Sequence, residues 1–324
     1  MIPDLPPGPE GPAPRIVYIG GWGRSGSTLL ARLLGEHPTM TFVGELRDLW
    51  HRGVAENRLC GCGEPFFECR FWSAVGERAF GGWDAVPVEL LERLRATVDK
   101  PWWVPFFRRG RVPGRVAEDA ALYVDLLTRV TRAMQDVVGP DGWIIDSSKI
   151  PSFAWLLGRI PGLDLRTVHL VRDARGSVYS WQKSVRRTDD PDAQGDDAPM
   201  MLQYNPLNAS ARYVVYNRQA EGLAQVSSHY VRTRYEDLVT EPERELDRIV
   251  ERLDLPGWDN GQLRDGSIQL GPSHSVVGNP MRMNTGWIPL RPDTAWKQDM
   301  DAGSRRLVTA VTGSTLRRYD YTLT

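Results

Sequence analysis

Residues 15–30 read RIVYIGGWGRSGSTLL, an apolar run followed by a glycine-rich turn and an amphipathic stretch. The run RIVYIG predicts a buried strand, and STLLARLLGEHP after the turn has the apolar spacing of a helix that ends at a proline. Glycines between a strand and a helix let the backbone curl, so that its N–H groups and the helix N-terminus point at an anion. We therefore predict a phosphate-binding loop as the first unit of the fold.

The loop has the spacing of a Walker A motif, with four residues between Gly21 and Gly26, but Ser27 stands where a nucleoside-triphosphate loop carries its lysine. A cation appears three residues earlier, as Arg24. Without that lysine, and without a convincing strand-end aspartate to hold magnesium, the loop is a poor match to an ATP site. The alternative that the glycines serve only to turn the chain stays open at this point.

Strand-like and helix-like segments alternate along the rest of the chain. Apolar runs predict strands at 39–44, 142–146, 165–173 and the start of 229–238; helical spacing covers 87–98, 118–138, 151–160, 174–185 and 241–255. This order predicts an α/β fold, a three-layer sandwich with a central, mostly parallel sheet whose ligands bind beyond the C-terminal ends of the strands.

Some segments interrupt this alternation. Six prolines among residues 1–14 predict a disordered tail, which leaves 15–324 as a single domain. We interpret the tryptophan- and arginine-rich stretch 101–115 and the aspartate-rich stretch 186–203 as loops. The acidic part of the second, 189–197, is expected to be solvated and flexible, with a lid over the acceptor as the alternative. The two stretches belong to two expected insertions, near 50–115 and 186–203.

The overall composition describes an ordinary globular chain. Forty-one per cent of the residues are apolar, 25 per cent are charged, and the formal net charge is −1. We therefore expect no nucleic-acid partner, no transmembrane segment and a cytoplasmic location, and any anion site must be local. The composition leaves the oligomeric state open.

A second motif, LVRDARGSVYSW at 170–181, also follows a predicted strand. It places Arg172 at the strand end and Ser180 about two helical turns further on. An arginine grips a phosphate through two parallel hydrogen bonds, and a serine hydroxyl adds a donor. The alternative is that Arg172 simply pairs with the neighbouring Asp173.

Together the two motifs resemble those of sulfotransferases that use 3′-phosphoadenosine 5′-phosphosulfate. The resemblance implies that the first loop holds the 5′-phosphosulfate and that Arg172 and Ser180 hold the 3′-phosphate. The loop residues concerned are Arg24, Ser25, Gly26, Ser27 and Thr28. Its Arg-Ser-Gly-Ser form is closer to the carbohydrate and tyrosylprotein branches, of the bacterial type, than to the cytosolic branch.

Later segments extend this resemblance. LLGEHPTMTFVGELRDLW implies Glu45 as the catalytic base, IIDSSKIP implies Lys149 as a catalytic lysine, and RYEDLVTEP implies that Tyr235 lies near the adenosine. The C-terminal stretch HSVVGNPMRMNTGW resembles a loop that closes over the nucleotide. Its candidate residues are Ser275, Asn279 and Arg282.

The implied reaction is in-line transfer of a sulfuryl group to a hydroxyl group of a small-molecule, carbohydrate or lipid acceptor. Arg24 would neutralise charge on the 5′-phosphate, and the chemistry requires no metal. Two other functions stay open: a P-loop kinase that uses Mg-ATP on a small molecule, and a nucleotide-binding module without catalysis.

Alternatives also remain for the single residues. Glu45 would be structural if it paired with Arg47 or Arg52, and His51 ranks second as the base. Lys149 would be a solvated residue before a proline. For Ser275 and Asn279, ordinary loop chemistry is equally consistent with the sequence.

The chain's three cysteines, Cys60, Cys62 and Cys69, cluster in CGCGEPFFECRFW. Their spacing lacks the paired C-x-x-C of known zinc folds, although a zinc site completed by His51 remains an alternative, as does a disulfide. We expect reduced thiols and no metal. The aromatic residues at 102–107 are expected in the core, with an acceptor pocket as the alternative.

Overall fold

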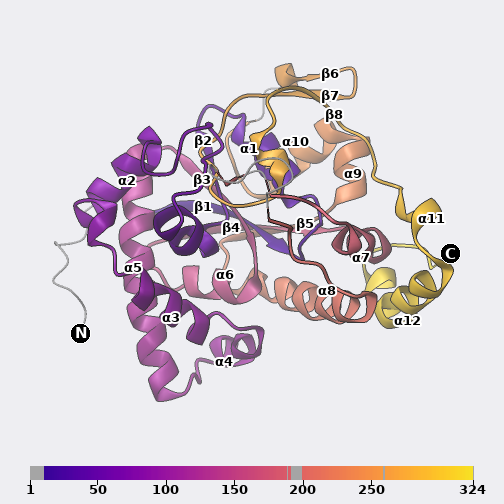
Figure 1. The fold of residues 1–324 in the computed structure, drawn as a ribbon, viewed down its shortest axis with the longest axis horizontal. Coiled ribbons are helices and arrows are strands. Elements are labelled where there is room, and N and C mark those ends of the chain that lie inside the picture. The colour runs from indigo at the N-terminus through magenta and orange to yellow at the C-terminus, as the bar shows by residue number, and fades with distance from the viewer. Residues whose placement is uncertain (1–10, 188, 191–198, 258–259, 324) are drawn as a thin grey trace.

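The computed structural model describes residues 11–187, 189–190, 199–257 and 260–323. At its centre lies a five-stranded, fully parallel sheet in the order β2-β3-β1-β4-β5 (Figure 1). The strands are β1 (Arg15–Gly21), β2 (Met40–Gly44), β3 (Trp143–Lys149), β4 (Asp164–Val171) and β5 (His229–Arg234). The predicted α/β fold with a parallel sheet is confirmed.

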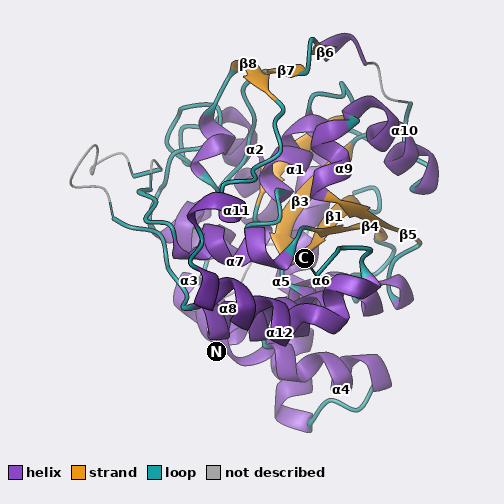
Figure 2. Ribbon diagram, turned by 90° about the vertical axis from the view of Figure 1, so that its right-hand side faces the viewer, coloured by secondary structure: helices purple, strands orange, loops and turns teal. Residues whose placement is uncertain are grey.

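Helices cover both faces of this sheet because alternate strand residues point to opposite sides. In β1, Ile16 and Tyr18 belong to one buried cluster, and Val17 and Ile19 belong to another. The first cluster includes α2 (Arg70–Phe80), α3 (Val88–Val98), α5 (Gly114–Val138) and α6 (Pro151–Leu157). The second includes α1 (Ser27–Gly35), α9 (Tyr235–Thr240) and α10 (Pro242–Arg252). Figure 2 shows the sheet between these layers.

A third cluster joins helices from the second half of the chain. It comprises α7 (Ala174–Gln182), α8 (Pro206–Glu221), α11 (Trp296–Asp299) and α12 (Ala302–Arg318), which lie together at one side of the molecule (Figure 1). A small antiparallel sheet is formed by β6 (Leu263–Arg264), β7 (Ser267–Leu270) and β8 (Gly286–Pro289). The sequence patterns did not predict α2, α8, α12 or this second sheet.

The stretch 101–115 is helical, so the prediction of a loop there is wrong. It contains the 3₁₀ turn Pro101–Trp103, helix α4 (Val104–Arg109) and the start of α5. Prolines at the first helical positions and the burial of Val104 and Phe107 explain this result. Trp102 and Phe106 are exposed, so they do not belong to the expected core.

Parts of the two predicted mobile segments, residues 1–10, 188 and 191–198, lie outside the described residues. Asp189, which belongs to the stretch expected to be solvated, is instead buried and forms an ion pair with Arg187 at 3.0 Å. Within the described part of the chain, no helix is both long and apolar enough to cross a membrane.

Candidate active site

A cavity of about 670 Å³ opens at the C-terminal ends of the central strands. Each strand end supplies a wall: Arg24 follows β1, Glu45 follows β2, Lys149 ends β3, Arg172 follows β4, and Tyr235 follows β5. Ligands of doubly wound sheets bind at this edge, where the loops of neighbouring strands meet. Predicted site residues that are far apart in the sequence therefore share one cavity.

Two glycines of the first loop are required by close packing. A Cβ atom on Gly23 would clash with the Trp181 ring, and one on Gly26 would clash with the Tyr235 ring. Gly26 also has a φ of 92°, which favours glycine. The glycines thus allow two aromatic rings to close against the loop, in addition to turning the chain.

The N-terminus of α1 is open toward the cavity. No side chain caps it, and its first turn contains no acidic residue. Ser27 and Thr28 of this turn line the cavity, and the buried Oγ of Ser25 has no hydrogen-bond partner among the described residues. Free backbone donors, the helix dipole and an unpaired hydroxyl together form a site for an anion.

Arg24 adds a cation to this site. Its guanidinium lies 5.1 Å from the centre of the Trp181 ring, and its Nη2 lies 3.5 Å from the Met201 sulfur. It forms no ion pair within the described ranges of the chain. Burial lowers the pKa of Arg24, because the charged form loses hydration. An anionic ligand would offset this loss.

Arg172 connects the second motif to the first. Its Nη1 donates to the Arg24 carbonyl at 3.1 Å, and its Nη2 donates to Asp293 Oδ2 at 3.0 Å. Its guanidinium also lies 4.7 Å from the centre of the Tyr235 ring. Ser180 lines the same cavity.

The alternative pairing of Arg172 with Asp173 is wrong. The Asp173 side chain instead caps α7 by accepting from the Arg175 backbone N–H, and it pairs with the Arg175 guanidinium at 2.7 Å. The second motif therefore contains two separate arginine contacts, and Arg172 is the one that reaches the cavity.

Glu45 and Lys149 form an ion pair, with 2.6 Å between Glu45 Oε1 and Lys149 Nζ. The Lys149 ammonium also donates to the Ser147 carbonyl at 2.7 Å. Lys149 has a φ of 68°, which is uncommon for a residue with a side chain. Its side chain is only 12 % exposed, so it is not the solvated residue of the alternative interpretation.

The neighbouring cations have other partners. Arg47 pairs with the buried Asp99, and Arg52 pairs with Glu56 at 2.6 Å. Surface pairing of either arginine with Glu45 is therefore wrong. His51 lines the cavity, but its Nε2 lies 3.3 Å from Glu56.

A buried carboxyl group that the sequence did not single out lies beside Glu45. Asp146 Oδ1 accepts from the Ser148 backbone N–H at 2.8 Å and from that of Leu46 at 3.4 Å, and Oδ2 has no partner among the described residues. Burial raises the pKa of Asp146 to about 7, and the charge of Glu45 contributes to the rise. The apolar strand before Asp146 was the available signal for its burial.

Of the three nucleotide-binding candidates in the C-terminal loop, only Asn279 reaches the cavity. Asn279 lines the cavity, and its side chain caps the 3₁₀ turn Pro280–Met283. Ser275 and Arg282 are buried and are not among the lining residues. Arg282 donates to the Ser275 carbonyl at 2.6 Å and to the Leu59 carbonyl at 2.7 Å, so in this structure it holds the loop in place.

Aromatic side chains form one wall of the cavity. Trp22 lies 5.4 Å from Trp181 and 4.7 Å from Tyr216, measured between ring centres, and Tyr204 lies 4.9 Å from Trp181. This wall was not predicted from the sequence, although Trp22 and Trp181 lie within the two motifs. The aromatic segment 102–107 does not contribute to it.

The cavity is cationic although the chain is nearly neutral. Among the described residues that line it, seven cationic side chains face three carboxylates, whereas the whole chain has a formal net charge of −1. The cations are Arg24, Arg47, Arg52, Lys149, Arg172, Arg187 and Arg212. Arg47, Arg52 and Arg187 pair with carboxylates that do not line the cavity, so much of this excess is already neutralised. Arg24, which forms no ion pair within the described ranges, remains to attract an anionic ligand.

Comparisons with known proteins identify the family of this chain. The model of the sulfotransferase family matches residues 77–260, which is more than half of the chain. This range contains Lys149, Arg172, Ser180 and Tyr235 but not the first loop. Among curated proteins, no sequence matches the chain.

Solved structures of bacterial sulfotransferases are also similar to this chain. The sulfotransferase domain from the olefin synthase of Synechococcus PCC 7002 has 21 % identity and a TM-score of 0.50, with 98 % of each chain covered. The sulfotransferase domain from the curacin biosynthetic pathway has 16 % identity and a TM-score of 0.47, covering 97 % of this chain and 99 % of the other. Sulfotransferase STF9 from Mycobacterium avium has 12 % identity and a TM-score of 0.45, covering 97 % and 79 %. The first of these similarities supports the fold.

Proposed function

Because the chain belongs to the sulfotransferase family of enzymes, we propose that its cavity binds 3′-phosphoadenosine 5′-phosphosulfate and transfers the sulfuryl group to an acceptor hydroxyl. One observation carries this proposal. Arg172 of the second motif donates a hydrogen bond to the carbonyl of Arg24 in the first, so two anion-binding elements adjoin in one cavity. A nucleotide with phosphates at both its 5′ and 3′ positions would engage both elements.

The first element fits a 5′-phosphosulfate. The open N-terminus of α1 and the unpartnered Ser25 hydroxyl would donate to its oxygens, together with Ser27 and Thr28. Arg24 would supply the charge that a nucleoside-triphosphate loop obtains from its lysine.

The second element fits a 3′-phosphate. Arg172 and Ser180 would bind it, and Tyr235, which lies between the two motifs, would contact the nucleoside. Burial opposes ionisation of Asp293, but the hydrogen bond and charge of Arg172 outweigh it and lower the pKa of that carboxyl. A bound phosphate would therefore replace a carboxylate that already neutralises Arg172.

When bound, the cofactor supplies an activated sulfuryl group attached to its 5′-phosphate. Glu45 would accept the proton of the acceptor hydroxyl, while the acceptor oxygen would bond to sulfur and the sulfur–oxygen bond to the leaving phosphate would break. Lys149, 2.6 Å from Glu45, would contact the transferring group. Arg24 and the loop N–H groups would stabilise the charge that develops on the leaving phosphate.

The aromatic wall bears on the acceptor. Trp22, Trp181, Tyr204 and Tyr216 offer ring faces beside the catalytic residues. Such faces favour an acceptor with an apolar or ring surface, which sugars, phenols and lipids all possess. Asn279 and Val277 would border the nucleotide from the C-terminal loop.

Binding of the desulfated product, 3′,5′-adenosine bisphosphate, tests the proposal. We expect it to raise the melting temperature, and we expect Arg172→Ala to weaken its affinity about 10- to 100-fold, because charged hydrogen bonds are lost. Calorimetric titration would measure the affinity. Arg218→Ala is a matched control, since Arg218 is exposed and pairs with Glu221 away from the cavity.

The two alternative functions predict different results. Stabilisation by Mg-ATP but not by the bisphosphate would indicate a kinase and overturn the proposal. Tight bisphosphate binding without transfer of ³⁵S from labelled cofactor to any of a broad panel of hydroxyl acceptors would indicate a binding module.

A further inference from the structure

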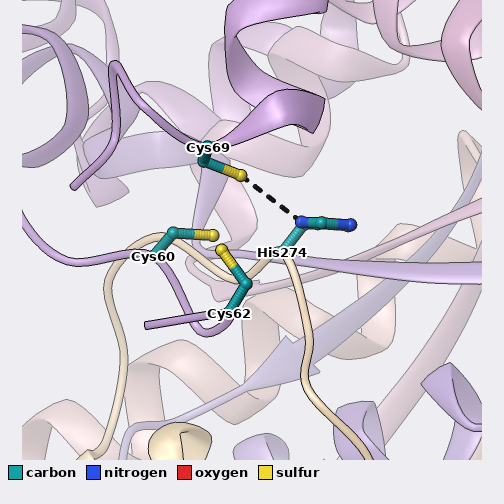
Figure 3. Close-up of side chains that lie close together, drawn as sticks. All are labelled: Cys60, Cys62, Cys69 and His274. Carbon is teal, nitrogen blue, oxygen red and sulfur yellow. Dashed lines mark hydrogen bonds between the residues drawn. The ribbon is translucent and has the colours of Figure 1, made fainter. Parts of the chain in front are cut away.

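We propose that Cys60, Cys62, Cys69 and His274 form a structural zinc site that fastens the C-terminal loop to the N-terminus of α2. The four ligand atoms all lie within 4.8 Å of one another (Figure 3). His274 is 205 residues beyond Cys69, and its Nδ1 lies 3.4 Å from the Cys69 sulfur. No local sequence pattern groups this histidine with the cysteines.

The dimensions suit tetrahedral zinc. Bonds of about 2.3 Å to sulfur and about 2.0 Å to nitrogen place tetrahedral ligand atoms roughly 3.5 to 3.8 Å apart. The Cys69–His274 separation is already close to that range, and rotamer adjustments of the half-buried Cys62 and His274 would draw in the remaining atoms. Three thiolates and an imidazole make a donor set that selects zinc over magnesium or calcium.

The surrounding backbone is built to hold these ligands. The backbone N–H of Cys62 approaches the Cys60 sulfur, and that of Glu64 approaches the Cys62 sulfur, as is common around metal-bound thiolates. Cys69 is the N-cap residue of α2, where the helix dipole favours a negatively charged sulfur.

The histidine ring is also fixed. It stacks on Phe71 with 5.0 Å between ring centres and an angle of 12°, and its backbone carbonyl accepts from the Trp72 indole at 2.8 Å. The alternative with His51 as the fourth ligand is wrong, because His51 pairs with Glu56 and lies outside this cluster.

Gly61 allows the cysteine-bearing loop to lie against the C-terminal loop that carries His274. A Cβ atom on Gly61 would clash with the hydroxyl groups of Ser273 and Ser275. The Gly61 N–H donates to the Ser275 carbonyl at 2.9 Å, and its carbonyl accepts from Ser273 at 3.4 Å. The segments that carry Cys60, Cys62 and His274 are therefore joined directly by backbone hydrogen bonds.

All four zinc ligands would come from the protein, which indicates a structural role. Two residues beyond His274, the Val276 N–H donates to Val43 at 3.0 Å, and the Val276 carbonyl accepts from Glu45 at 3.0 Å. The zinc site would therefore support the loop that borders both Glu45 and the cavity. Binding Zn²⁺ would displace the three thiol protons.

Metal analysis of the purified chain tests the site. We expect about one zinc ion per chain in the wild type and in His229→Ala, a control on the edge strand β5. Cys69→Ser and His274→Ala should bind zinc more than about 100-fold more weakly, since they lose a ligand and not merely an outer partner. After zinc removal, added Co²⁺ should give the visible bands of a tetrahedral thiolate complex.

Failure of Cys69→Ser to fold would leave the wild-type metal content and Co²⁺ spectrum as the deciding measurements. Wild-type protein with neither stoichiometric zinc nor a tetrahedral Co²⁺ spectrum would overturn the proposal. A single reactive thiol in denatured, unreduced protein would also overturn it, because the other two cysteines would then form a disulfide. Metal content, the Co²⁺ spectrum and the thiol count do not depend on sulfuryl transfer. The zinc site could therefore be refuted while the proposed function stands, and the reverse is also true.

Discussion

At the scale of single residues, the Glu45–Lys149 ion pair is the proposed chemical centre of the cavity. The side chains are 16 % and 12 % exposed, so the pair is shielded without being sealed from an entering acceptor. A carboxylate is the form of Glu45 that accepts a proton, and the Lys149 ammonium lies 2.6 Å from it. In the proposed reaction, Glu45 would act as the base, and Lys149 beside it would contact the transferring group.

Glu45→Gln should lower kcat by about 10²- to 10⁴-fold, because the amide cannot accept the acceptor's proton. Affinity for the bisphosphate should change little, since the anion-binding elements remain. Steady-state transfer assays and calorimetric titration would separate the two effects. Glu251→Gln, an exposed change on α10, serves as the control. Unchanged kcat in Glu45→Gln would transfer the role of base to another group, with His51 next in order.

Asp146 makes stability depend on pH. Its pKa is raised to about 7, so the folded chain binds a proton that the unfolded chain releases near pH 4. The unfolding free energy should therefore fall as the pH rises from about 4 to 7, with a total loss of a few kcal/mol at about 1.4 kcal/mol per pKa unit.

Asp146→Asn removes this titration, so its stability relative to the wild type should increase between pH 5 and pH 8 in urea unfolding. Asp265→Asn is the control, since Asp265 is 89 % exposed in its side chain. Parallel pH profiles for the wild type and Asp146→Asn would show that Asp146 is ionised in the folded state.

At the scale of elements, the first loop packs as a unit with two aromatic residues, one directly after β5 and one in α7. Gly26 has a φ of 92°, and its Cα faces the Tyr235 ring. Gly23 faces Trp181 in the same way, and the Trp181 indole donates to the Gly23 carbonyl at 3.1 Å. Disturbing a glycine therefore moves the nucleotide site as well as the turn.

Gly26→Ala should lose about 1–3 kcal/mol of stability and most of its bisphosphate affinity, because the new methyl group strains the backbone and displaces Tyr235. Gly110→Ala separates these effects. Gly110 has a φ of 62° at the C-terminus of α4, and nothing lies near its added Cβ. Gly110→Ala should lose stability but keep its affinity for the bisphosphate. Equal bisphosphate affinities in the two variants would refute the packing explanation.

The sequence predicted elements whose patterns are local. β1, the first loop and α7 follow from apolar runs, glycines and helical spacing that a window of ten to twenty residues contains. Helix α4 was missed because its prolines and aromatic residues suggest a loop until Phe107 is seen to be buried. Helix α8 was missed because its apolar residues follow the helical period only weakly.

Those residues of the candidate site that belong to short sequence motifs could be predicted, and the others could not. Arg24 and Arg172 follow from such motifs, and the structure brings them together. Asp293 was not predictable, because it approaches Arg172 from 121 residues further along the chain. His274 was missed for the same reason, since no local pattern connects it with Cys69.

At the scale of the whole molecule, charge is distributed unevenly. A chain of net charge −1 concentrates cations around one cavity. Since ions screen charges over about 10 Å at 0.1 M salt, bisphosphate affinity should fall as salt concentration rises. Titrations at several salt concentrations would measure this slope; an affinity independent of salt would contradict an electrostatic contribution to binding.

The central position of β1 has a consequence for synthesis on the ribosome. Ile16 pairs with Ile144, and Arg15 pairs with Asp164, so the first strand to emerge finds no partner until well over a hundred further residues have been translated. At about 5–20 residues per second, this apolar strand waits on the order of ten seconds. During that interval the nascent chain exposes a segment prone to aggregation, and chaperone capture before translation passes β4 would govern the yield of native enzyme.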